Sequence, residues 1–241
     1  MTLLIESLAL TLSNRTIVRN VTLNVTPGEV VGLLGPNGAG KTSTFNMIVG
    51  LINPNKGNIY LEGNSIKNFS MTERVQLGIG YLAQESSVFR NLTVIENLDI
   101  ALSQSNLSRS LCRKRRDELI EEFSLVSFLD RYGHQLSGGE RRRCEIARAL
   151  AVGPLGPKYL LLDEPFAGID PIAINDLQSL IRRLKEKNIG ILITDHNVRA
   201  TLAITSRAYI LNQGEILAYG SSDQLRKNQV VKDHYLGNSF D

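Results

Sequence analysis

The sequence predicts an α/β fold built on a largely parallel sheet, with a helical segment inserted between the two halves of that sheet. β-rich segments alternate with segments of helical periodicity, which is typical of parallel sheets with crossover helices. A mostly helical stretch, from about Val94 to Leu150, interrupts this alternation. The chain has 241 residues, 42% of them hydrophobic, which is enough for one large domain with a substantial core.

The first half of the expected sheet lies before the helical stretch. Residues 3–12 and 17–25 are rich in β-formers, and Asn14-Arg15 between them indicates a turn. Residues 29–34 form a buried apolar strand, and residues 43–51 have helical periodicity that ends at Gly50. Further short strands are expected at 57–63 and 79–82.

The second half of the sheet follows the helical stretch. Strands are expected at 159–163, 189–194, 208–211 and 215–219. Helices are expected at 172–186 and 198–203, so strands and helices alternate again. The strand order along the chain therefore agrees with a parallel core.

Composition and charge exclude several classes of protein. The formal charge is +3, from 27 basic and 24 acidic residues, which is too balanced for nucleic acid to be the main partner. The longest apolar runs have strand length, and the N-terminus lacks the basic region of a signal peptide. Cys112 and Cys144 have no metal-ligand spacing and are expected to be free thiols. We expect a soluble intracellular protein.

A phosphate-binding loop connects the strand at 29–34 to the helix that follows. Its sequence is Gly35-Pro36-Asn37-Gly38-Ala39-Gly40-Lys41-Thr42. Glycines let the backbone wrap around a polyphosphate, and the helix N-terminus adds exposed N–H groups. In this pattern the lysine reaches the β- and γ-phosphates and the threonine hydroxyl binds Mg²⁺. The loop thus predicts a site for the phosphates of a nucleotide and for Mg²⁺.

The apolar strand at 159–163 ends in two successive carboxylates, Asp163 and Glu164. In phosphate-loop enzymes an acid at this position holds Mg²⁺, and here that acid is Asp163. Glu164 is then free to accept a proton from the attacking water as a general base, or to orient that water. The alternative is an acidic strand end that caps the turn at Pro165.

Leu136-Ser137-Gly138-Gly139-Glu140 provides a second predicted helix N-terminus, capped by Ser137. Together with the phosphate loop and the carboxylate strand, this string resembles the signature of ABC-transporter ATPases. Gln84 matches the Q-loop glutamine of that family, 167–170 match its D-loop, and His196 matches its switch histidine. Taken alone, His196 could simply cap a strand–helix junction.

The resemblance implies a set of site residues. The catalytic group is Glu164, His196, Gln84 and Lys41. The Mg²⁺ ligands are Thr42, Gln84 and Asp163. The nucleotide-binding residues are Gly35, Pro36, Asn37, Gly38, Ala39, Gly40, Lys41, Thr42, Ser43, Ser137 and Gly139.

The resemblance also implies the architecture and the working unit. We expect a P-loop NTPase core of the RecA type with an N-terminal antiparallel β-subdomain, formed by 1–85 and 158–241. The signature belongs to an inserted helical subdomain at 86–157. Two copies would pair head to tail, so that Ser137 and Gly139 of one copy complete the ATP site of the other, and ATP would drive closure of the pair.

Four stretches, at residues 78–85, 137–149, 163–171 and 193–199, are similar to the corresponding stretches of the ATPases of lipopolysaccharide exporters. The closing Tyr235-Leu236-Gly237 also resembles branched-chain amino-acid importers, which remain the alternative, and a non-transport ABC ATPase is a third possibility. The family's membrane subunits would be separate chains that dock near Phe89 and Arg90. Phe89 could also be an ordinary core aromatic. The chain would then sit peripherally on the cytoplasmic side of an inner membrane, or on the stromal side in a plastid.

The chain departs from the family pattern in three places. Leu12 stands where an aromatic residue normally stacks on adenine, and Tyr60 or a neighbour is a possible substitute. The stretch Val152–Pro157 is long and predicts a surface loop. Ala83 replaces the proline that often precedes the glutamine.

Overall fold

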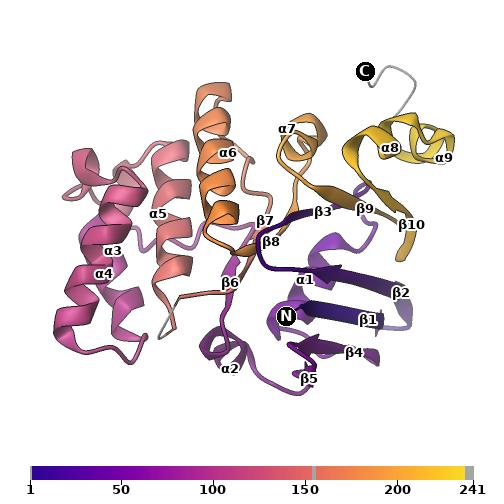
Figure 1. The fold of residues 1–241 in the computed structure, drawn as a ribbon, viewed down its shortest axis with the longest axis horizontal. Coiled ribbons are helices and arrows are strands. Elements are labelled where there is room, and N and C mark those ends of the chain that lie inside the picture. The colour runs from indigo at the N-terminus through magenta and orange to yellow at the C-terminus, as the bar shows by residue number, and fades with distance from the viewer. Residues whose placement is uncertain (1, 154–155, 237–241) are drawn as a thin grey trace.

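The computed structural model describes residues 2–153 and 156–236 and has one ten-stranded mixed sheet with helices around it (Figure 1). The strand order is β5-β4-β1-β2-β10-β9-β3-β8-β7-β6. The strands are β1 Leu3–Leu12, β2 Arg15–Val25, β3 Val30–Leu34, β4 Lys56–Leu61, β5 Asn64–Ser65, β6 Ile79–Leu82, β7 Tyr159–Asp163, β8 Gly190–Thr194, β9 Arg207–Asn212 and β10 Glu215–Gly220.

The α-helices surround this sheet on both faces and at one end (Figure 1). They are α1 Lys41–Val49, α2 Met71–Gln76, α3 Val94–Ser103, α4 Arg109–Glu122, α5 Gly138–Ala151, α6 Pro171–Glu186, α7 Val198–Leu202, α8 Ser222–Lys227 and α9 Gln229–Val231. Short 3₁₀ turns at Val126–Phe128 and Gly133–Gln135 connect α4 to α5, and a π-helix at Lys232–Leu236 follows α9.

The core of the sheet is parallel, as predicted. β3 pairs in parallel with β8 and β9, and β7 pairs in parallel with β6 and β8. All residues of β3, β7 and β8 are buried, because helices cover both faces of a parallel sheet. The α/β class and the strand order along the chain are therefore confirmed.

The N-terminal strands form an antiparallel layer. β1 pairs antiparallel with β2 and β4, and α1 lies between this layer and the parallel strands (Figure 1). Phe45, Met47 and Ile48 of α1 are fully buried in a cluster that includes residues of both layers. Packing α1 between two layers fixes the position of its N-terminus, where the phosphate loop ends.

Helices α3, α4 and α5 lie together at one end of the molecule, beyond α6 (Figure 1). Their apolar faces join one buried cluster with the strands β6, β7 and β8. Helix α5 begins with Ser137 as its N-cap, in a reciprocal capping box with Glu140, as the sequence predicts. These helices therefore pack on the sheet through a shared core.

Two local predictions are corrected by the structure. The first turn lies at Ser13-Asn14, both with positive φ, so β2 begins at Arg15 rather than at residue 17. Tyr60 pairs with Leu4 near the start of β1, eight residues from Leu12, which is about 26 Å along a strand. Tyr60 is therefore wrong as a substitute for a base-stacking aromatic. The predicted surface loop at 152–157 lies partly outside the described residues, since 154 and 155 are not among them, and so does residue 237 of the closing string.

Candidate functional site

The phosphate loop connects the end of β3 to the first turn of α1. Gly35 is required there because a Cβ atom on it would lie 2.0 Å from the Leu211 backbone oxygen. Gly40 precedes the helix with φ 104°, and a Cβ on it would lie 3.0 Å from the Ile17 oxygen of β2. At Gly35 and Gly40 the packing thus leaves space only for backbone. The loop's N–H groups and the N-terminus of α1 make a site for an anion.

Lys41 is buried in the loop, with 6% of its surface exposed. Its Nζ atom donates to the backbone oxygens of Gly35 at 2.8 Å and Pro36 at 3.0 Å. Burial lowers the pKa of Lys41 below its usual value, and the carboxylates of Glu164 and Asp163 offset part of that change. The two backbone oxygens thus hold the Lys41 ammonium inside the loop, where a phosphate is predicted to bind.

Asp163, at the end of β7, is a buried carboxylate whose oxygens make no well-formed hydrogen bond to the residues that the structure describes. The Tyr81 hydroxyl interacts with this carboxylate, but it supplies no positive charge. Burial, and after it the neighbouring Glu164 carboxylate, raises the pKa of Asp163 to about 6. A buried carboxylate is costly unless a cation compensates it. The residue therefore fits a magnesium ion.

The rest of the chemistry around Asp163 also fits Mg²⁺. Thr42 stands on the first turn of α1 and lines the same cavity as Lys41 and Gln84. Within residues 2–153 and 156–236, no group of three or more histidine, cysteine, aspartate or glutamate side chains is arranged to hold a metal. Mg²⁺ needs few carboxylates, because it keeps several waters and binds phosphate oxygens.

Glu164 follows Asp163 and is held from two sides. Its Oε2 accepts a hydrogen bond of 3.0 Å from Gln84 Nε2, and its Oε1 lies 2.7 Å from His196 Nε2. The backbone at Glu164 has φ 53°, which is unusual for a glutamate and indicates local strain. The residue is 6% exposed. Strain and two side-chain partners together fix the direction of this carboxylate.

Gln84, Glu164 and His196 come from segments that follow three neighbouring strands, β6, β7 and β8. The carboxyl ends of parallel strands meet at one edge of a sheet, which is where ligands bind in open α/β folds. A cavity of about 500 Å³ at this edge is lined by Arg15, Ile17, Asn37, Gly38, Gly40, Lys41, Thr42, Ser43, Gln84, Glu164 and His196. The structure therefore brings most of the predicted site residues together.

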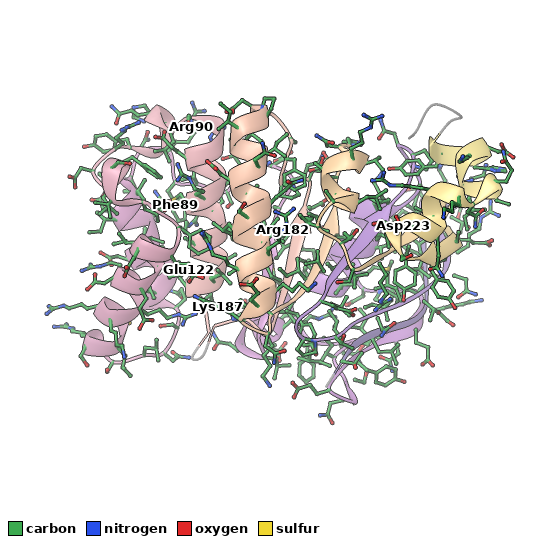
Figure 2. All side chains as sticks on the ribbon, turned by 45° about the horizontal axis from the view of Figure 1, so that its top comes forward. Phe89, Arg90, Glu122, Arg182, Lys187 and Asp223 are labelled. Atoms are coloured by element: carbon green, nitrogen blue, oxygen red, sulfur yellow. The ribbon has the colours of Figure 1, made fainter. Side chains whose placement is uncertain are left out.

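A larger cavity of about 680 Å³ lies elsewhere, between α4 and α6. Glu122 and Lys187 line it and form an ion pair of 2.6 Å at the ends of the two helices (Figure 2). It contains neither the phosphate loop nor any of the predicted site residues. Size alone therefore does not mark the functional site in this molecule.

Ser137 and Gly139 are not part of the cavity around Lys41. They line another cavity of about 220 Å³ with Asp170 and Ile172, at the N-termini of α5 and α6. The Ser137 backbone N–H bonds the Glu140 carboxylate at 2.9 Å. Within one chain Ser137 and Gly139 do not reach the phosphate loop's cavity.

Sequence reasoning missed the residues that hold the site together. Asp195 is buried, and its two oxygens accept from the backbone N–H groups of Phe166 at 2.8 Å and Asn197 at 2.7 Å. It thereby joins the segment after Glu164 to the segment that carries His196. Its position directly after a buried strand, like that of Glu164, is a signal that could have identified it.

Arg142 was also missed, and no sequence pattern distinguishes it from its arginine neighbours. Its guanidinium pairs with Glu145 at 2.9 Å and donates to the backbone oxygens of Gln84 at 3.2 Å and Glu164 at 3.4 Å. Glu145 in turn accepts from Ser86 Oγ at 2.7 Å. Helix α5 is therefore tied directly to the segments that carry Gln84 and Glu164.

The sequence profile described as ABC transporter matches residues 18–167. The chain is also 50% identical to the lipopolysaccharide export system ATP-binding protein LptB of Haemophilus influenzae, over 98% of this chain and 97% of that protein. The chain belongs to the ABC transporter family. Its membership means that it is an ATP-binding subunit that hydrolyses ATP.

Other ABC transporter proteins give the same result. The LptB protein of Escherichia coli K12 is 48% identical over 99% of this chain and 98% of its own length. A probable ABC transporter ATP-binding protein of Azorhizobium caulinodans is 48% identical over 97% of this chain and 82% of its own length. Relatives of this kind cover the described fold and the whole site.

Solved ABC cassettes have the same fold. The ADP conformation of an ATP-binding cassette matches with a TM-score of 0.87 and 27% identity, covering 98% of this chain and 99% of that one. The dimeric structure of a bacterial ABC transporter cassette matches with a TM-score of 0.78 and 26% identity, over 92% and 99% of the two chains. The predicted P-loop NTPase core, antiparallel β-layer and helical insertion are thereby confirmed.

Phe89 and Arg90 belong to the segment between β6 and α3, in the helical part of this ABC protein (Figure 2). Phe89 is 44% exposed, so the interpretation as a core aromatic is wrong. The Arg148 guanidinium lies over the Phe89 ring, 4.6 Å from its centroid. The Phe89 backbone N–H donates to Asn97 Oδ1 at 2.9 Å. Residues 2–153 and 156–236 contain no helix with the length and apolar character that crossing a bilayer requires.

Proposed function

We propose that this chain powers the export of lipopolysaccharide or a related lipid as the ATPase subunit of an ABC transporter. The observation that carries the catalytic part is the position of Glu164. Its carboxylate is held between Gln84 and His196 at the cavity that contains Lys41. The lipid substrate is inferred from the names of the relatives that are 48–50% identical over nearly the whole chain.

The site residues take the following roles in the proposal. The phosphate loop and α1 bind the triphosphate of ATP, and Lys41 neutralises its β- and γ-phosphates. Thr42, Asp163 and Gln84 hold Mg²⁺, which supplies charge stabilisation for phosphoryl transfer. Glu164 accepts the proton of the attacking water, and Gln84 and His196 orient its carboxylate.

A second copy of the chain completes the site. Ser137 and Gly139 line their own cavity, so they are available to a neighbouring molecule. A head-to-tail pair places the N-terminus of α5 of one copy on the γ-phosphate bound by the other. ATP then favours the closed pair, because it contacts both copies only in that state. In the proposal the chain divides into a core at 1–85 and 158–241 and a helical part at 86–157, and these two parts move relative to each other when the pair closes.

The membrane subunits are separate chains that dock at Phe89 and Arg90. The exposed ring of Phe89 is held in place by Arg148, which itself stands on α5, the helix that begins with the signature. Docking there connects a membrane partner to the helix that completes the ATP site. The chain works peripherally, on the cytoplasmic side of an inner membrane or its plastid equivalent.

Co-purification tests the transport assignment. The tagged chain is isolated from native membranes, and the bound proteins are identified by mass. We expect lipid-exporter membrane subunits, and a reduced yield of them for Phe89→Ala. The control is Leu111→Ala, on the exposed face of α4. Recovery of amino-acid permease subunits would contradict the lipid assignment and leave the ATPase assignment intact.

A further inference from the structure

The cavity of about 500 Å³ around Lys41 is called the phosphate cavity below. A further cavity, called the second cavity, adjoins it and has no assigned occupant. It has a volume of about 480 Å³ and is formed by three segments, namely the start of β2, the phosphate loop and the β9–β10 turn. Its lining residues are Asn14, Arg15, Thr16, Ile17, Arg19, Gly38 and Gln213. The β9–β10 turn is fixed against the loop, since the Gly214 N–H donates to the Ala39 oxygen at 3.0 Å.

This cavity and the phosphate cavity are continuous. Arg15, Ile17 and Gly38 line both of them. Lys41, which marks the triphosphate end, belongs only to the phosphate cavity. The second cavity therefore lies on the Gly38 side of a nucleotide whose phosphates are at Lys41.

None of the described residues that line the second cavity is aromatic. Leu12 is 46% exposed and lines neither cavity, and Tyr60 lies at the opposite end of β1. Arg15, Ile17 and Arg19 occupy every second position of β2, so their side chains share one face of that strand. Only Arg15 and Ile17 of these three reach both cavities.

The Arg15 guanidinium is available to a ligand. The residue is exposed, and among the residues that the structure describes its side chain makes no ion pair or hydrogen bond. The turn at Ser13-Asn14, with φ values of 47° and 62°, places Arg15 at the mouth of the cavity as the first residue of β2. Ile17, two residues further, provides an apolar surface next to it.

We propose that the Arg15 guanidinium stacks on the nucleobase, with Ile17 as its apolar support, in place of an aromatic side chain. This inference rests on the proposed function, since it assumes a nucleoside triphosphate in the adjoining cavity. A guanidinium is planar and weakly hydrated, so it stacks on π faces better than an ammonium does. Arg15 is thus a specificity-determining residue for the nucleoside part of the substrate.

The test compares ATP with inorganic tripolyphosphate, which has the phosphates and no base. Dissociation constants are measured by calorimetry on the full chain and on Arg15→Ala and Arg15→Lys. We expect both variants to raise the Kd for ATP about fivefold and to change the Kd for tripolyphosphate less than about twofold. Arg15→Lys behaves like Arg15→Ala because an ammonium keeps the charge without the plane.

Two further variants sharpen the result. Leu12→Tyr in the Arg15→Ala background is expected to recover most of the ATP affinity, because it supplies an aromatic ring on the opposing strand. Arg113→Ala removes one exposed charge on α4, far from the cavity, and leaves both dissociation constants unchanged.

Each other outcome has a defined meaning. Equal weakening of ATP and tripolyphosphate by Arg15→Ala overturns the stacking and makes Arg15 a phosphate contact. An unchanged Kd for ATP overturns any contact. Lys41→Ala separates this inference from the proposed function: if the parent protein binds no ATP, or if Lys41→Ala does not weaken both ligands, the nucleotide site itself is wrongly placed.

Discussion

Replacing Glu164 with glutamine removes the proton acceptor and changes little else at the site. The amide oxygen of the introduced glutamine can still accept from Gln84 Nε2, which is 3.0 Å from the carboxylate in the parent protein. The contact with His196 changes from a 2.7 Å pair with a carboxylate to a bond with a neutral amide. The phosphate loop, Lys41 and Asp163 keep their positions, so ATP binding should survive.

The size of the effect follows from what a general base contributes. Positioned proton acceptors account for about 10²–10⁴ in rate. We therefore expect the kcat of Glu164→Gln to fall by at least about 100-fold, equivalent to about 3 kcal/mol of transition-state stabilisation. The dissociation constant for ATP should change less than about threefold, because Glu164 carries no phosphate contact in the proposed arrangement.

Steady-state phosphate release and nucleotide calorimetry measure these two quantities. Light scattering then follows the mass of the particle with ATP present. We expect Glu164→Gln to accumulate as a pair of chains, since closure no longer ends in hydrolysis. The matched control is Glu62→Gln, which loses an ion pair with Lys158 at a position outside the site and should retain full activity.

Undiminished hydrolysis by folded Glu164→Gln would refute the assignment of Glu164 as general base. A loss of ATP binding together with hydrolysis would instead indicate that Glu164 supports the loop. Full loss of kcat with retained ATP binding but no pairing of chains would refute the head-to-tail arrangement and leave the catalytic role in place.

Three other changes have expected outcomes. Lys41→Ala should weaken ATP binding at least about tenfold in calorimetry, because it removes the charge held at the loop, and an unchanged affinity would contradict the phosphate role. Arg74→Met should lower the free energy of unfolding by about 3 kcal/mol in denaturant titration. Arg74 is fully buried and donates to four backbone oxygens, two of them on α1. The control Arg113→Met should leave the free energy of unfolding unchanged. For Glu29, burial opposes ionisation, but hydrogen bonds from Arg207 and Thr26 outweigh it and hold its pKa below the usual value. The stabilisation is therefore present above about pH 4.5 and is lost as pH falls through the lowered pKa. The parent protein should exceed Glu29→Gln in free energy of unfolding by about 1 kcal/mol at neutral pH, and this difference should shrink between about pH 5 and pH 3. A difference that stays constant with pH would refute this.

Local sequence patterns predicted the parallel strands closely. The strands at Ile79–Leu82 and Tyr159–Asp163 have the predicted bounds, because each is an apolar run that ends at a polar residue or turn. Helix α5 begins at Gly138, and its cap is Ser137 as predicted. Short-range chemistry decides these features, so a single sequence contains the information.

Contacts between distant segments could not be predicted in the same way. Arg74 looks like a surface residue of a short helix, yet it is fully buried against α1. Arg142 is one of three consecutive arginines, and only the packing of α5 against Gln84 and Glu164 gives it a role. Both are decided by which backbone oxygens the fold leaves within reach.

The sequence by itself determined the chemistry at each motif, because phosphate binding, capping and strand burial depend on residue types a few positions apart. The tertiary structure decided how those motifs meet. Gln84 and His196 reach Glu164 because β6, β7 and β8 end at one edge of the sheet. Arg15 reaches the phosphate cavity because β2 crosses the loop at Gly40. Such approaches depend on the packing of whole layers, and residue spacing along the chain does not encode them locally.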